Sequence, residues 1–122
     1  MKSRKSRLDN LSDQELVAEF RKTSGLFGEA VANWMPAGKE NDRLIALLQE
    51  LRRRGTQVRL QLAPLLDERN RFVRYYAAKH LLGLIPSRSR EIIEAETKEG
   101  DAIAGDAGML LDRVDSGQYK PD

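Results

Sequence analysis

Apolar residues recur every three or four positions along most of the chain, which predicts amphipathic helices. The first stripe begins at Leu16, breaks near residues 35–38 and resumes at Leu44. The same spacing continues over residues 58–66, 72–84, 92–95 and 103–114. No stretch alternates with period two for long enough to predict a strand. The pattern therefore predicts an all-α fold of about six helices.

Capping and breaking residues predict where these helices begin and end. Ser12 and Glu15 have capping-box spacing at the start of the first helix. Gly25, after Ser24, predicts a weak point or kink, because glycine costs about 1 kcal/mol inside a helix. Pro64 predicts a bend in the third helix. We expect the five later helices at about residues 41–54, 56–66, 70–85, 87–99 and 101–114.

A faint internal repeat of thirty residues runs through the second half of the chain. Apolar residues match in five pairs: Leu62 and Ile92, Val73 and Ile103, Ala77 and Ala107, Leu81 and Leu111, and Leu84 and Val114. A fixed period with paired helices is the signature of an α-solenoid, in which helical hairpins bury their apolar faces against their neighbours. We therefore expect one domain of three hairpins over residues 11–116. A disordered basic tail at 1–10 and a frayed tail at 117–122 would flank it.

The segment from Leu65 to Leu82 resembles one hairpin of a HEAT-like repeat. The residues that carry the resemblance are Leu65-Leu66-Asp67, Asn70, Val73-Arg74, Ala77-Ala78 and Leu81-Leu82. The wider layout is similar to a family of short bacterial proteins classed as a domain of unknown function. Its members have a leucine-serine-acid capping box, an Arg-rich helix end followed by Gly, and a Leu-Leu-Asp turn. The matching segments are residues 11–20, 44–55 and 58–84.

This resemblance covers most of residues 11–115. It implies an α-α superhelix and assigns no chemistry. Gly105 and Gly108 depart from it, because they stand where better helix formers are expected, and they predict an irregular or end-capping last helix.

Composition excludes several kinds of chemistry. The 122 residues include no Cys and one His, His80, so disulfides and thiolate metal sites are excluded. The acids are not clustered as a Mg²⁺ or Ca²⁺ site requires, and we expect no metal and no cofactor. No apolar run approaches the roughly 20 residues that cross a bilayer. We expect a bacterial protein of the cytoplasm that does not enter a membrane.

The net charge of +2 gives little support for nucleic-acid binding. The basic residues Lys2, Arg4, Lys5 and Arg7 lie in the first seven positions, so the remainder of the chain is close to neutral. Phosphate binding requires basic residues concentrated on one face. A solvated tail is the favoured interpretation of the N-terminal cluster, and a clamp for an anionic surface is the alternative.

The candidate partner-binding residues are Arg71, Arg74, Tyr75 and Lys79. They lie beside the main apolar stripe of their helix and would share one exposed strip on the concave face of a solenoid. Arginine beside tyrosine suits recognition of carboxylates or phosphates. In the alternative interpretation, which we favour, Arg74 pairs with an acid such as Asp67 and Tyr75 packs against a neighbouring helix.

Other chemistry-bearing residues have structural interpretations that we favour. Arg52, Arg53 and Arg54 point about 100° apart around a helix and complement its negative end. His80 lies on an apolar face with no nucleophile beside it, which favours a core histidine with one hydrogen bond. Trp34 and Phe27 lie on the first stripe. We expect them to anchor the core, and the alternative is that they line a pocket.

These observations favour a non-enzymatic protein-interaction module that binds a partner protein through its concave face, in an adaptor or immunity-like role. The alternative is a HEAT-like nucleic-acid-binding protein with a basic groove. Three basic residues on that strip would give a salt slope of only about −2.7 and weak binding. An enzyme is the third hypothesis, and both a monomer and a homodimer remain open.

Overall fold

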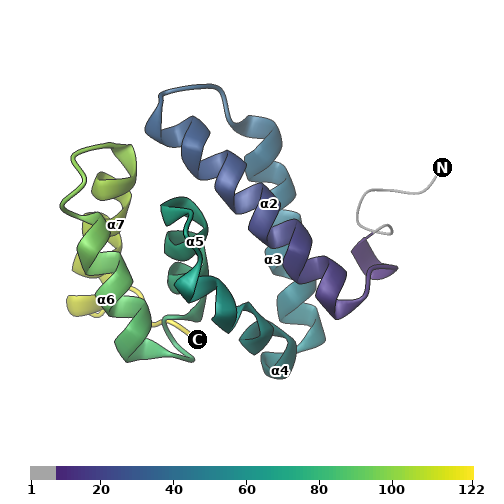
Figure 1. Ribbon diagram of the computed structural model, residues 1–122. Helices are drawn as coiled ribbons and strands as arrows, with labels where there is room; N and C mark the ends of the chain where they lie inside the picture. The colour runs from purple at the N-terminus through teal and green to yellow at the C-terminus, as the bar shows by residue number, and fades with distance from the viewer. Residues whose placement is uncertain (1–7) are drawn as a thin grey trace.

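The structure is a computed structural model that describes residues 8–122. Within this range the chain forms six α-helices, one 3-10 helix and no strand, which confirms the all-α prediction. The elements are α2 (Asp13–Ala32), α3 (Gly38–Arg54), α4 (Thr56–Arg59), the 3-10 helix η1 (Leu60–Asp67), α5 (Arg71–Leu81), α6 (Pro86–Glu96) and α7 (Ala102–Asp115). Figure 1 shows α2 running alongside α3, with α5 and the α6–α7 pair on its other side.

Side-chain caps mark the starts of α2, α5 and α7, whereas α3 and α6 begin without one. The Glu15 amide donates to the Ser12 hydroxyl at 3.0 Å, and the Ser12 amide donates to the Glu15 carboxylate at 2.8 Å. The predicted capping box is therefore confirmed. Asn70 accepts from two amides at the start of α5, and Asp101 accepts from one at the start of α7. These caps satisfy amides that have no partner within the helix.

The third helix differs from its prediction as a single α-helix. Only Thr56–Arg59 is α-helical, and the chain tightens into 3-10 turns over Leu60–Asp67. Pro64 has no amide hydrogen, and its ring clashes with the carbonyl four residues earlier, so α-helical bonding is lost around it. The shorter 3-10 pattern replaces it.

The glycines of α2 bring two helices close together and do not interrupt the helix, so the predicted weak point at Gly25 is wrong. A Cβ at Gly25 would lie 3.3 Å from a Val73 methyl. A Cβ at Gly28 would collide with the Phe72 side chain, whose Cγ would be 2.6 Å away. Here α5 packs where α2 has no side chain. The gain in close packing offsets the low helix propensity of glycine.

One buried core joins all the elements. Both members of three predicted repeat pairs are buried: Leu62 and Ile92, Val73 and Ile103, and Ala77 and Ala107. In the fourth pair, Leu81 is buried and Leu111 is half-buried. Two positions expected on inward stripes, Leu26 and Ile45, are exposed.

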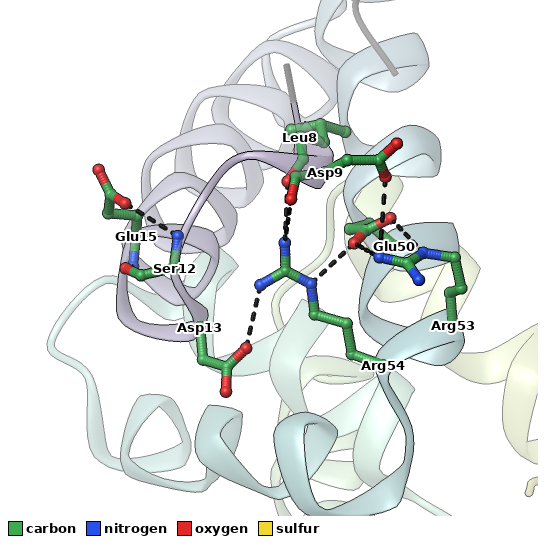
Figure 2. Close-up of polar contacts among 8 residues, drawn as sticks. All are labelled: Leu8, Asp9, Ser12, Asp13, Glu15, Glu50, Arg53 and Arg54. Carbon is green, nitrogen blue, oxygen red and sulfur yellow. Dashed lines mark hydrogen bonds and ion pairs between the residues drawn. The ribbon is translucent and has the colours of Figure 1, made fainter. Parts of the chain in front are cut away.

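Hydrogen bonds and ion pairs hold the first described residues against the end of α3 (Figure 2). Leu8 is 1% exposed, although the sequence predicts disorder through residue 10. Arg54 donates to the Leu8 carbonyl oxygen at 2.9 Å and pairs with Asp13 at 3.0 Å. The remainder of the predicted disordered tail, residues 1–7, lies outside the described range.

A buried glutamate binds the arginines that hold this first segment in place. Glu50 is 3% exposed, and its carboxylate accepts hydrogen bonds from Arg53 at 2.9 Å and from Arg54 at 2.7 Å (Figure 2). The Arg53 guanidinium is the main cause that lowers the pKa of Glu50 to about 2, against the opposing effect of burial. A buried charge of this kind needs such partners to remain ionised.

The last residues also pack against the body of the protein, where the sequence predicts fraying over 117–122. Asp122 forms ion pairs with Arg52, near the end of α3, and with Arg59. The yellow end of the chain turns back from α7 toward α5 (Figure 1). Arg52 therefore has a different partner from Arg53 and Arg54, which both pair with Glu50.

Candidate functional site

A groove of about 620 Å³ lies between α2, α5 and α7, and we call it the α2–α5–α7 groove. Its lining residues are Phe27, Val31, Trp34, Asn41, Tyr76, Lys79, Ala102, Gly105, Asp106 and Met109. The four residues from α7 stand at positions i, i+3, i+4 and i+7 and so occupy one face of that helix. Two of them are Ala102 and Gly105, so this wall of the groove has little side-chain bulk.

Trp34 stands at the rim of this groove in an unusual backbone conformation. The C-cap of α2 is Asn33, and Trp34 follows it with φ of 57°, the one left-handed residue other than glycine in the described range. The Trp34 amide donates to the Val31 carbonyl at 3.2 Å, and the Met35 amide donates to the Ala30 carbonyl at 2.8 Å. This is the Schellman ending of a helix, in which the left-handed position is ordinarily glycine.

The left-handed turn sends the indole ring into solvent. Trp34 is 83% exposed, and its neighbour Met35 is 61% exposed. The prediction that Trp34 anchors the core is therefore wrong, because α2 ends at Ala32, before the apolar stripe reaches residue 34. Phe27, predicted with it, is half-buried and packs against Tyr76, with ring centroids 5.4 Å apart.

A small polar network links α5 to α7 beside the groove. Tyr75 is fully buried, and its hydroxyl donates to an Asp106 carboxylate oxygen. The Lys79 ammonium lies 3.2 Å from the same oxygen and 5.9 Å from the Tyr76 ring centroid. Burial, reinforced by the bond to Asp106, raises the pKa of Tyr75. The hydroxyl therefore stays neutral, and it ties α5 to α7.

The sequence and the fold of this chain are both similar to those of known proteins. A family model described as a domain of unknown function, DUF2019, matches residues 14–115. The chain belongs to the DUF2019 family. No curated protein matches the chain.

The DUF2019 fold has a solved relative. The crystal structure of the protein RPA1889 from Rhodopseudomonas palustris CGA009 is similar to this chain, with a TM-score of 0.81 and 34% sequence identity. The similarity covers 94% of this chain and 98% of that one. The α2–α5–α7 groove therefore belongs to a fold that is already known from a crystal.

The four predicted site residues of this DUF2019 chain do not form one exposed strip. Tyr75 is buried, as the favoured alternative interpretation anticipates. Arg74 donates to the main-chain carbonyls of Glu68 at 2.7 Å and Arg69 at 2.9 Å, and not to Asp67. Of the four, only Lys79 lines the groove.

Arg71 forms ion pairs with three acids at the end of α6 and the start of α7. It pairs with Asp101 at 2.8 Å, with Glu96 at 2.9 Å and with Glu99 at 3.7 Å. The bond to Asp101 is the largest of the effects that raise the pKa of Arg71. A phosphate or carboxylate ligand would have to displace three acids to reach this guanidinium.

His80 lies beside the network and stays uncharged. Its ring packs edge-on against Phe20, with centroids 6.3 Å apart. Burial is the main cause that lowers the pKa of His80 to about 3, and the Lys79 charge adds to it. A neutral, packed imidazole is not poised for acid–base exchange near pH 7.

Neither a metal-binding cluster nor a membrane span is found in the part of the chain that the structure describes. Among residues 8–122, no three acid or histidine side chains lie together as a metal site requires. In the same range, no helix is both long and apolar enough to cross a membrane.

Sequence reasoning missed Met109 as a site residue and gave pocket lining only as the less favoured interpretation of Trp34. Trp34 continues the apolar stripe of the first helix, whereas Met109 lies off the apolar stripe of the last helix and is 55% exposed. The one available signal was Pro36 in the sequence. It ends the helix early and removes position 34 from the stripe.

Proposed function

We propose that this DUF2019 chain is a non-enzymatic protein-interaction module that receives a partner protein in the α2–α5–α7 groove, in an adaptor or immunity-like role. The observation that carries the proposal is Trp34, an exposed indole in a backbone conformation that an L-residue adopts at a cost. Glycine would relieve that cost, and we take the exposed ring to be retained for binding.

The chemistry of the rim supports this proposal. Tryptophan and methionine are enriched in protein interfaces, and tryptophan dominates among residues that contribute most binding energy. Trp34, Met35 and Met109 are all exposed large apolar side chains. Two of them line the same groove. A partner that covers them would remove apolar surface from water.

The finer architecture in this proposal is a HEAT-like superhelix of three hairpins. Its support is the burial of matched positions in the second and third hairpins, such as Val73 with Ile103. Packing of α5 on both α2 and α6 is consistent with stacked hairpins. The groove then lies on the concave side of a short solenoid. We place the protein in the bacterial cytoplasm within the same proposal.

Nucleic-acid binding has less support. Arg71 and Lys79, two of the three basic residues needed for that interpretation, pair with acids inside the molecule. The third, Arg74, donates to main-chain carbonyl oxygens. Little free positive charge is left along α5 to attract phosphates.

Photo-crosslinking in the native host tests the proposal. A photoreactive phenylalanine analogue is placed at Met35 or Met109 on the rim, and at exposed Gln61 as the control position. We expect a discrete crosslinked protein from both rim positions and none from position 61. The crosslink should disappear when Trp34→Ala is added. The same products from rim and control positions, or products indifferent to Trp34→Ala, would overturn the proposal.

A further inference from the structure

Residues 118–122 form a strap that lies along the body of the protein. The chain turns at Gly117, whose φ of 79° is left-handed, and the Tyr119 amide donates to the Arg113 carbonyl oxygen at 3.0 Å. The strap then passes over Gly83, just after α5. A Cβ at that glycine would lie 2.7 Å from the Pro121 carbonyl carbon. The absence of a side chain at Gly83 gives an extended segment room to pass.

Two arginines hold the acidic end of this strap. Arg52 and Arg59 both pair with the Asp122 carboxylate, Arg59 at 3.5 Å. Arg59 also donates to the Asp122 carbonyl oxygen at 3.4 Å and to the His80 carbonyl oxygen at 3.1 Å. Arg59 is only 9% exposed. If the strap were removed, this buried guanidinium would keep only the His80 carbonyl oxygen as a partner.

The strap fills its site incompletely. Beside Gln118 and Tyr119 lies a cleft of about 390 Å³, lined by Arg52, His80 and Arg113 among others. On the side of Pro121 lies a second cleft of about 300 Å³, lined by Leu82, Gly83 and Arg90 among others. The surface around the strap can therefore accommodate a bulkier segment than the chain's own residues.

We propose that this surface is a binding site for an extended acidic segment of a partner protein, one with proline followed by aspartate or glutamate. The chain's own strap occupies the site in cis, and the partner's segment binds by displacing it. Gly83 supplies room for the incoming main chain, and Arg52 and Arg59 bind the carboxylate. The strap thus shows how the partner's segment binds, and it blocks the site until it is displaced.

The contacts of the strap suit displacement. The Arg52 and Asp122 side chains are 43% and 60% exposed, and ion pairs this exposed contribute little stability. The cationic groups that face the cleft are Arg52, Lys79 and Arg113, against one acid, Asp106. An acidic segment is therefore attracted, and a basic one is repelled.

A peptide titration tests this site separately from the groove. The probe is a fluorescent peptide of residues 117–122 with an amidated end, so that the aspartate side chain supplies the carboxylate. Its binding is measured by anisotropy to the full chain and to the full-length variant Asp122→Lys, whose strap no longer pairs with the arginines. Three double variants add Arg52→Glu, Gly83→Ala or, as the matched charge control, Arg69→Glu.

We expect Asp122→Lys to bind the peptide at least about tenfold more tightly than the unaltered chain, because a tethered competitor acts at roughly millimolar effective concentration. Arg52→Glu and Gly83→Ala should each weaken that binding at least about tenfold. Arg69→Glu should leave it within about twofold, since Arg69 lies in the turn before α5, at the opposite end of that helix from Gly83. Trp34→Ala should have no effect, which distinguishes this site from the groove.

Three outcomes would overturn the proposal. Equal binding, or no binding, by the unaltered chain and Asp122→Lys would show that the strap does not occupy a peptide site. Indifference to Gly83→Ala would reduce the binding to charge attraction. A dimer of the unaltered chain that Asp122→Lys dissociates, seen by sedimentation, would assign the site to a second copy of this chain.

Discussion

Replacing Trp34 with glycine removes a side chain and a backbone strain together, whereas replacing it with alanine removes the side chain alone. At φ of 57° an L-residue costs about 1–2 kcal/mol. Alanine regains about 0.4–1 kcal/mol over glycine, because it has less freedom in the unfolded chain. The difference predicts that Trp34→Gly is more stable than Trp34→Ala by about 1 kcal/mol.

The loss of the ring itself can be worked out from its exposure. Trp34 is 83% exposed, so roughly 40 Å² of its surface is buried, worth about 1 kcal/mol. The glycine variant should therefore match the unaltered protein in stability, and the alanine variant should be about 1 kcal/mol less stable. Both variants should lose the crosslink at the groove rim.

Urea denaturation followed by circular dichroism measures these differences directly, with the slope checked for constancy among the three proteins. The reasoning is refuted if Trp34→Ala is as stable as Trp34→Gly or more so. In that case the left-handed turn would not be strained, and the argument that the ring is kept for binding would lose its basis.

Four further variants probe other features of the fold. Gly28→Ala forces a methyl group into Phe72 and should lower stability by about 1–3 kcal/mol in urea titrations, whereas Gly108→Ala, which faces open space, should raise it by up to about 1 kcal/mol; equal effects would contradict the packing described. Because the pKa of His80 is lowered to about 3 in the folded protein, protonation favours the unfolded chain, and stability should fall by about 2 kcal/mol between pH 6 and 4.5. His80→Gln should remove that fall in stability. A pH profile that His80→Gln leaves unchanged would argue against His80 as the cause of the fall. The pKa of Glu50 is also lowered, to about 2, so its stabilisation is present above pH 4.5 and is lost toward pH 2. Glu50→Gln should cost about 2–3 kcal/mol at pH 7 but little at pH 2, and a cost that is independent of pH would refute the ionised assignment.

Local signals predicted most helix starts to within a residue, because they act through neighbouring residues, whereas the ends of α5 and α6 come three or four residues earlier than expected. The caps at Ser12, Asn70 and Asp101 need only a side chain and the next turn of backbone. Pro64 likewise predicted a bend in the third helix, but the pattern did not specify that this part would form 3-10 turns.

The site was harder to predict, because it depends on contacts between distant segments. Tyr75 lies off the main stripe of its helix but is buried, since α5 is packed by α2 on one side and by α6 on the other. Glu50 appears in the sequence as an ordinary surface acid. Its burial depends on the arginines that follow it and on the segment at Leu8 that they bind.

The close approach of α2 and α5 links two positions that lie 44 residues apart, Gly28 and Phe72. A larger residue at 28 fits only if the aromatic ring at 72 becomes smaller. Among DUF2019 sequences we therefore expect these two positions to vary together, with one accommodating bulk wherever the other gives it up.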